Sequence, residues 1–180
     1  SSQGNAANFG TLTESTQSMG SSSNSTRGIF GAGDNPSASN FINYITIAAT
    51  GNAADFGDLT VARFGAAGLS STTRSIFAGG GTPSKQNVID FIEIASTGNA
   101  TDFGNLVSSV SGATGASSST RGVFCGGANG GSQKNIQFIT IASQGNAIDF
   151  GDLGAITNLS SALSNSVRFI NGGGGPSNLN

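Results

Sequence analysis

Apolar residues of this chain gather in short runs that glycine and small polar residues interrupt. The strongest runs, rich in Ile, Phe, Tyr and Thr, cover residues 41–48, 88–95 and 135–142. Such β-branched and aromatic residues favour extended strands. In the second run, Ile89 and Phe91 fall on one face of a strand, whereas Ile92 and Ile94 fall on the other. We therefore expect these strands to be covered on both faces, as in sheets that stack face to face.

The same pattern returns every 47 residues without insertion or deletion. The triplet Gly-Asn-Ala, for example, begins at Gly4, Gly51, Gly98 and Gly145. A fixed period of this size is typical of repeat proteins, in which each copy is one supersecondary unit stacked on its neighbours. The sequence thus predicts one all-β array over residues 1–180. Its units are 1–47, 48–94, 95–141 and 142–180, the last lacking one strand.

Each unit carries further short elements around this strand. After the triplet comes a short segment with an aromatic anchor, supplied by Phe9, Phe56, Phe103 and Phe150. A Ser/Thr/Gly-rich segment follows, such as 65–73, for which we expect an exposed or loosely patterned strand and turn. Next is an apolar strand that ends in glycines, which permit a tight turn or close backbone approach. Segments rich in Pro, Gly, Ser and Asn are expected as surface loops at 34–40, 81–87, 128–134 and 175–180.

Composition narrows the classes of protein. With 29 Gly and only 9% charged residues the chain could be read as low-complexity disorder, but twelve Phe recur at matched positions and favour a fold. A net charge of -2 without a basic stripe does not predict nucleic-acid binding. No apolar run approaches the ~18–20 residues of a membrane-spanning helix. Cys125 is expected to be a small buried filler, since Ala78 and Gly172 replace it in other copies.

No set of residues forms a catalytic constellation. The chain has no His, which removes the usual general base and the usual transition-metal ligand. Asp-Phe-Gly recurs with the repeat, and the glycines at 172–175 lack a following Lys-Ser/Thr, so neither predicts a phosphate site. Repeated acids could supply oxygen ligands to Ca²⁺, but Asp58 and Asp152 are replaced by Thr11 and Asn105 in other copies. We predict no enzyme activity, no cofactor and no metal.

Four arginines follow the same period and are the main candidate functional residues: Arg27, Arg74, Arg121 and Arg168. A planar group with five donors suits repeated structural bridges. We expect each to hydrogen-bond carbonyls or an acid between adjacent units, at an interface shared with Phe56, Phe103 and Phe150. The alternative is a ring of arginines that binds an anion or a sugar carboxylate.

The order of segments in one unit, TRSIFAGGG, a loop, NVIDFIEIA and ATDFGNL, resembles a blade of the kelch family. In that family a strand ending in a Gly-Gly doublet precedes a variable loop and two further strands. The resemblance implies a four-bladed kelch-like β-propeller with about four short strands per blade. The family's Trp is absent, so Phe56, Phe103 or Phe150 would take its place. A linear β-solenoid is the alternative.

The amino-acid sequence of the repeat, such as TGNATDFGNL with SSSTRGVF, also resembles tandem repeats of large bacteriophage virion proteins, especially tail and fibre proteins of phages that infect cyanobacteria. This resemblance implies a non-enzymatic structural or adhesive protein, a virion appendage component or filament subunit, in a virion or extracellular location. The alternative is a carbohydrate-binding propeller for a cell-surface glycan, for which the chain offers Tyr44 but no Trp. A propeller hydrolase is a third class and would need clustered carboxylates.

The last unit suggests how the chain assembles. Four copies of 47 residues would need 188 residues, and the 180-residue sequence stops before the counterpart of 40–47. We expect a processed product or a section of a longer array, since no Met begins the sequence. We also expect a homo-oligomer or tandem array, in which a neighbour supplies a strand equivalent to 41–47. A persistent gap is the other possibility.

Overall fold

The computed structural model describes residues 4–175, and this part of the chain contains strands and turns but no helix. The all-β prediction is therefore confirmed. The strands are β1 (Gly20–Ser23), β2 (Arg27–Gly31), β3 (Phe41–Thr46), β4 (Ala54–Asp58), β5 (Ala67–Ser70), β6 (Arg74–Ala78), β7 (Gly81–Thr82), β8 (Ser84–Lys85), β9 (Val88–Glu93), β10 (Thr101–Asn105), β11 (Ser111–Ser117), β12 (Arg121–Ala128), β13 (Gln133–Thr140), β14 (Ile148–Thr157), β15 (Ser161–Ser164) and β16 (Phe169–Gly172).

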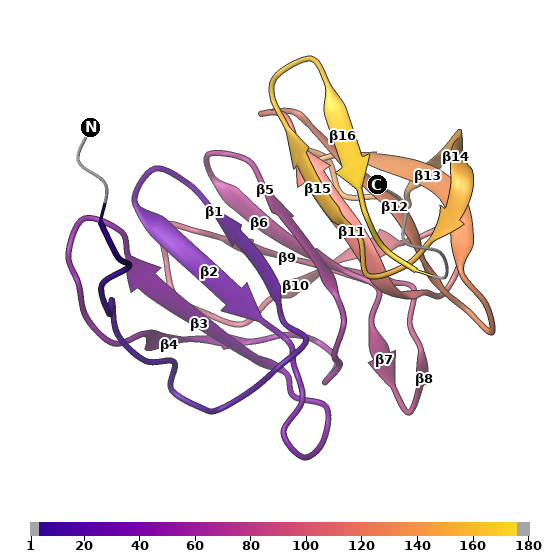
Figure 1. Cartoon of the computed structure of the whole chain (residues 1–180). Coiled ribbons are helices and arrows are strands. Elements are labelled where there is room, and N and C mark those ends of the chain that lie inside the picture. Colours follow the sequence, from indigo (N-terminus) through magenta and orange to yellow (C-terminus); the bar gives the residue numbers. More distant parts are fainter. Residues whose placement is uncertain (1–3, 176–180) are drawn as a thin grey trace.

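Twelve of these strands form three antiparallel sheets of four. The first sheet has the order β1-β2-β3-β4, the second β5-β6-β9-β10 and the third β11-β12-β13-β14. Strands β15 and β16 pair only with each other and are called the terminal hairpin. The small hairpin β7–β8 projects from the second sheet (Figure 1).

The sheets stack in chain order through their first strands. β1 lies against β5, β5 against β11, and β11 against β15. The stack is open within the described residues: the first sheet stands at one end and the terminal hairpin at the other (Figure 1). Because no sheet closes on itself, the stacked all-β repeat is established, whereas the four-bladed propeller stays a prediction.

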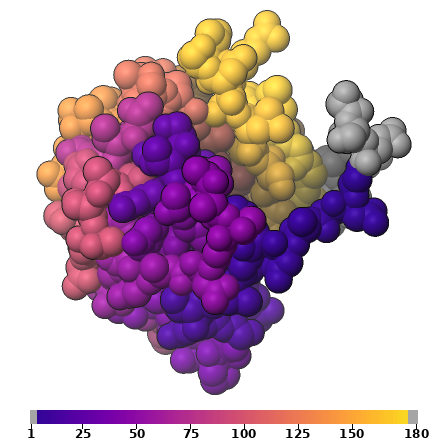
Figure 2. Space-filling model, turned by 90° about the vertical axis from the view of Figure 1, so that its left-hand side faces the viewer, coloured from indigo at the N-terminus to yellow at the C-terminus, as the bar shows by residue number. Residues whose placement is uncertain are grey.

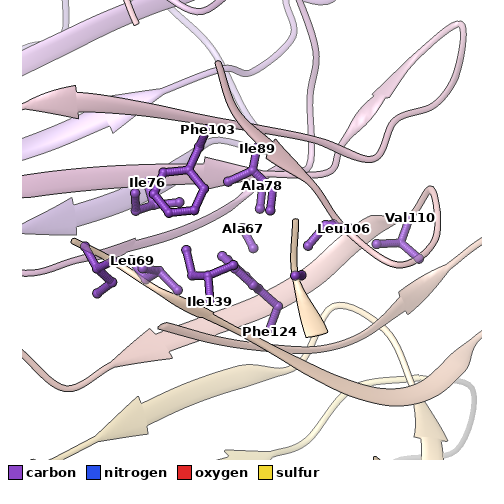
Figure 3. Packing of buried hydrophobic residues seen from close by; sticks show 12 residues of the cluster. Ala67, Leu69, Ile76, Ala78, Ile89, Phe103, Leu106, Val110, Phe124 and Ile139 are labelled. Atoms are coloured by element: carbon purple, nitrogen blue, oxygen red, sulfur yellow. The ribbon is translucent and has the colours of Figure 1, made fainter. Parts of the chain in front are cut away.

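A hydrophobic core fills the space between each pair of complete sheets. Between the first and second sheets, Ile42 and Phe56 meet Phe77 and Ile92. Between the second and third sheets, residues such as Ile76 and Phe103 pack with Phe124 and Ile139 (Figure 3). Strands β3 and β9 are thus buried on both faces, as the alternation of their side chains predicts: Ile42 and Asn43 point in opposite directions and both are buried. In β13 only the face of Gln137 and Ile139 is buried, and Ile136 and Phe138 on its other face are partly exposed.

The sheets are offset from the sequence units. The Phe-Gly strand that opens one sequence unit, such as β4, pairs with the last strand of the preceding unit, such as β3. In the first copy the same segment, residues 7–11, is not a strand, because no third strand lies beside it. The expected loop at 175–180 falls almost wholly outside the described residues.

The Ser/Thr/Gly-rich segment 65–73, expected to be an exposed or loosely patterned strand and turn, does contain a strand, β5. This strand is not exposed, because Ala67 and Leu69 are buried in the middle of the stack. Its small residues let neighbouring backbones approach closely. A Cβ on Gly68 would collide with the Ser21 carbonyl of the first sheet.

Candidate assembly site: the repeat junction and its open end

The repeated residues meet where one sheet packs on the next, a region called here the junction. The Gly-Asn-Ala triplet docks beside the last strand of the preceding sheet. Gly98 N and Ala100 N donate to Phe56 O and Asp58 O at 2.7 and 2.8 Å. In return, the amide of Asp58 donates to Asn99 Oδ1 at 3.0 Å. The triplet is therefore an adhesive element between units as well as a turn.

The same three hydrogen bonds occur at each copy of the junction. At the next step Gly145 N and Ala147 N donate to Phe103 O and Asn105 O. At the beginning of the chain, the triplet at 51–53 holds the segment 9–11 in the same way. The 47-residue spacing of the triplet is thus the spacing of these contacts.

A glycine in the last strand of each sheet makes room for the docked triplet. Gly104 has φ of +147°, and a Cβ there would lie 2.5 Å from Gly145 O. Real Cβ atoms do not approach a carbonyl so closely, and a side chain at this φ is strained as well. Gly151, the equivalent residue in the third sheet, has open space in front of it instead.

In the first and second sheets, the arginine at the start of the second strand bridges to the next sheet. Arg74 Nη1 donates to Ile141 O at 3.0 Å and to Ala142 O at 3.1 Å. Its Nε also pairs with Glu93 at 2.7 Å, and its guanidinium lies 4.6 Å from the centre of the Phe91 ring. Arg27 donates in the same way to Ile94 O.

The last two arginines have no next sheet to bridge to. Arg121 stacks 4.5 Å from the centre of the Phe138 ring, and its guanidinium makes no hydrogen bond or ion pair with any described residue. Arg168 likewise makes none within residues 4–175, and both line the groove at the end of the stack. The structure therefore brings Arg27 and Arg74 into junctions and leaves the other two at an open surface; it gathers no ring of four.

The three phenylalanines predicted at the interface differ in the same way: Phe56 and Phe103 are buried in junctions, and Phe150 lies at the open end. Phe56 and Phe103 are 3% exposed inside the two cores and pack edge-on to Tyr44 and Phe91. Phe150 makes the corresponding edge-on contact with Phe138 but is 62% exposed. What buries the first two is the following sheet.

Buried polar side chains form a further junction contact that the sequence analysis missed. Asp90 accepts from the Thr60 amide and hydroxyl of the preceding sheet, and Gln137 accepts from the Val107 amide at 2.8 Å. Asn43 does the same for Thr13. All three occupy the same repeat position in the third strand of their sheets. A polar residue that recurs at this position of an otherwise apolar strand could have revealed the contact from the sequence.

At one junction this contact is ionic. Arg63 Nη1 lies 2.9 Å from Asp90 Oδ2, and both side chains are fully buried. Burial lowers the pKa of Arg63 below its ordinary value, and the neighbouring carboxylate opposes that shift. The guanidinium also donates to Val61 O and Phe77 O. Thr16 and Val110 occupy the equivalent repeat positions, so this charge is a local feature of the junction between the first and second sheets.

A ladder of serines connects the inner strands. Ser70 Oγ donates to Ser23 O, Ser117 Oγ to Ser70 O, and Ser164 Oγ to Ser117 O, each step spanning 47 residues. The ladder runs through all three sheets and extends to the terminal hairpin. It links strands whose small side chains offer little apolar surface.

The end of the stack is an apolar open face. Seven of the nine large exposed hydrophobic residues fall between residues 148 and 170, which places them at this end: Ile148, Phe150, Ile156, Leu159, Leu163, Val167 and Ile170. Between the third sheet and the terminal hairpin lies a groove of about 530 Å³, lined by Val123, Ile136 and Phe150 together with serines and the two arginines. An apolar concentration of this kind marks an interaction surface.

The titratable and nucleophilic side chains of the described residues do not gather in a cluster that could bind a metal ion. No group of three or more His, Cys, Asp or Glu side chains in residues 4–175 could hold a metal. Cys125 is buried, and burial raises the pKa of its thiol to about 11, so it remains protonated near neutral pH. None of the described segments is a helix long and apolar enough to cross a membrane.

No protein-family model matches the chain, and no curated protein is significantly similar to it. The junction and its open end are therefore the features from which a function can be argued.

Proposed function

We propose that this chain is a non-enzymatic structural protein whose function is to build an array of repeats, as a component of a virion appendage or of a filament. The observation that carries the proposal is the junction. Its main-chain hydrogen bonds recur at each step, and its apolar contacts remain open at the terminal hairpin. The recurring residues are used for packing one unit on the next, and none of them forms a reactive cluster within the described part of the chain.

The kelch-like propeller is the architecture proposed for the array, with the linear β-solenoid as its alternative. Antiparallel four-stranded sheets that stack through their first strands support the propeller, because propeller blades pack around an axis with their first strands innermost. Electron microscopy of the purified assembly separates the two: rings support the propeller, and straight rods of stacked sheets support the solenoid.

The virion assignment rests on the resemblance of the repeat to phage tail and fibre repeats. Mass spectrometry of purified phage particles that encode the chain tests it directly. Recovery of its peptides in stoichiometric amount with known tail components supports the assignment. Their absence from particles, with presence in the infected-cell lysate alone, would refute it.

A glycan-binding function is the second candidate, since one observation favours it. The groove beside the terminal hairpin presents the exposed ring of Phe150 among serine, asparagine and arginine donors, a combination suited to a sugar ring with its hydroxyls. The same groove is also where the next repeat would pack, because Phe56 and Phe103 are buried at this position by the following sheet. The structural role therefore accounts for more of the groove's residues.

A glycan array separates these two functions. The structural proposal expects no saturable binding to any glycan, by the wild type or by Phe150→Ser. Saturable binding to a defined sugar that is lost in Phe150→Ser but kept in Val107→Ser, a similarly exposed apolar site elsewhere, would replace the proposal with the lectin. Turnover of a polysaccharide by the purified chain would support the third class, a hydrolase.

A further inference from the structure

The two ends of the stack carry opposite halves of one junction. The exposed arm at residues 4–6 is a Gly-Asn-Ala triplet without a strand to dock on, and the third sheet ends in a strand without a triplet. The arm extends beside the first sheet and projects from the body (Figure 2). We propose that two copies of this chain associate head to tail, the first sheet and arm of one copy packing on the terminal hairpin and third sheet of the other. This inference rests on the array-forming function proposed above.

The main-chain hydrogen bonds of the junction are the first observation that supports this association. Within the chain, triplets donate to the carbonyls of Phe56 and Asp58 and of Phe103 and Asn105. The next carbonyls in this series belong to Phe150 and Asp152, and no described residue donates to them as a triplet. Gly151 between them keeps the open space and the positive φ that Gly104 uses to admit a triplet. The arm of a second copy supplies one.

Side-chain size is matched between the first strand of one sheet and the second strand of the next. Ser22 of the first sheet meets Ser75 of the second at 2.6 Å. One junction further on, Leu69 meets Gly122, where a Cβ would come within 2.8 Å of the leucine. A large residue on one sheet thus packs against glycine on the next sheet.

The two free faces continue this matching. Leu163, 64% exposed in the terminal hairpin, occupies the position of Leu69. Gly28 of the first sheet occupies the position of Gly122, and the three atoms nearest to a Cβ there belong to Ile45 and Phe30 of its own sheet. Head-to-tail packing sets Leu163 on Gly28 and reproduces the internal pair.

The serine ladder also has two free ends. Ser164 O follows the last rung, and Ser23 Oγ precedes the first one; neither makes a hydrogen bond to another side chain in residues 4–175. Across a head-to-tail contact, Ser23 Oγ of one copy can donate to Ser164 O of the other. The ladder would then run through both molecules.

A second copy fits better than the chain's own arm. The segment that follows the arm is held to the first sheet by the hydrogen bond from Gly51 N to Phe9 O, and the terminal hairpin lies beyond the third sheet, so the second and third sheets stand between the first sheet and the terminal hairpin along the stack (Figure 1). The contact is heterologous: different patches meet, so it can propagate into a filament or close into a ring of copies.

Two surface substitutions test the inference by sedimentation velocity over a range of protein concentrations. The first sheet is the head of each copy and the terminal hairpin is its tail. Leu163→Asp blocks the tail, because it places a carboxylate opposite Gly28 of the second copy. Ser23→Asp blocks the head, because it places a carboxylate opposite the Ser164 carbonyl of the second copy. Val107→Asp is the matched control, an exposed apolar residue away from both ends. The wild type and the control should gain mass with concentration, whereas each blocked variant alone should remain a monomer.

Mixing the two blocked variants gives the decisive result. One free head and one free tail remain, so a 1:1 heterodimer should form and grow no further. A wild type that is monomeric at every concentration overturns the inference, and so does a mixture that stays monomeric while the wild type associates, which would indicate a symmetric contact. Both positions are exposed, so circular dichroism and melting should match the wild type; Leu163→Ala replaces Leu163→Asp if the latter unfolds.

The outcome is separable from the proposed function. A monomer that also binds no glycan refutes head-to-tail association and leaves the structural role standing. Saturable glycan binding refutes the structural role whatever mass is found.

Discussion

At the scale of single residues, the most consequential feature is a buried ion pair that only one junction contains. Arg63 and Asp90 are both inaccessible to solvent, and Arg63 Nε has no partner among the described residues. Removing two charges from water costs several kcal/mol per ion, which their attraction offsets only when the geometry is good. The neighbouring junction uses the neutral residues Val110 and Gln137 at the same positions. The pair therefore occupies positions that the neighbouring junction fills without charge.

The first prediction separates breaking this pair from replacing it. Arg63→Val alone leaves Asp90 buried without its partner and should lower the free energy of unfolding by about 3–5 kcal/mol. Arg63→Val combined with Asp90→Gln copies the neutral pair and should recover most of that loss. Urea unfolding of the single and double variants measures both. Additive losses would show that the two residues act independently.

The second prediction concerns the pH dependence that Cys125 confers. Burial raises the pKa of its thiol from 9.0 to about 11, so between these values the unfolded chain loses a proton that the folded chain keeps. Stability must then fall as pH rises through this window, by roughly 2–3 kcal/mol in total, at about 1.4 kcal/mol per pH unit. Below pH 9 the thiol contributes no slope.

Cys125→Ala is the control for this effect, since Ala78 fills the equivalent place in the second sheet. Its unfolding free energy, measured between pH 8 and 11, should lack the decline assigned to the thiol. Equal slopes for the two proteins would assign the decline to other groups.

At the scale of the element, the junction shows what sequence reasoning can and cannot reach. The strands rich in Ile and Phe follow from their composition, and they are observed where the pattern predicts them, as β3, β9 and β13. The central place of β5 does not follow. Gly68 and Ser70 carry no hydrophobic signal, because their role is to let backbones approach and to donate to a carbonyl.

The candidate site was predictable to a similar degree. A recurring arginine predicts a recurring bridge, and Arg27 and Arg74 have one. No local pattern distinguishes Phe150 from Phe103, since the difference lies in whether a following sheet covers the ring. The Arg63–Asp90 pair was detectable only as two charges at positions that are neutral in other copies.

The third prediction uses two arginines as a matched pair. Both Arg74 and Arg121 stack on a phenylalanine at nearly the same distance, 4.6 and 4.5 Å, but only Arg74 reaches two carbonyls and a glutamate. Arg74→Met should destabilise the chain by about 1–3 kcal/mol through lost charged hydrogen bonds. Arg121→Met should cost less than about 1 kcal/mol.

The difference between the two losses, measured by urea unfolding, isolates the bridge from the stacking. Equal losses would mean that stacking on the ring, rather than the carbonyl bridge, is what the repeated arginine contributes.

At the scale of the whole molecule, stability is distributed along one dimension. Each sheet contacts only its neighbours, so the free energy is close to a sum of sheet and junction terms. The second sheet has a core on both sides, whereas the terminal hairpin has two strands and leans on β11 alone. Unequal local stability is the expected consequence, with the end of the stack opening before its middle.

The fourth prediction follows from this gradient and is checked by native-state hydrogen exchange. Amides of β6 and β9, in the doubly covered second sheet, should exchange only through global unfolding, and their opening free energy should fall with added urea. Amides that pair Leu163 with Ile170 in the terminal hairpin should exchange through local opening, with a small free energy that urea hardly changes.

Because the hairpin face is the tail of the head-to-tail contact, its protection should also rise with protein concentration in the wild type but not in Leu163→Asp. Protection of the hairpin equal to that of β9 in dilute protein would show that the stack unfolds as one cooperative unit, with no weak end for a second copy to stabilise.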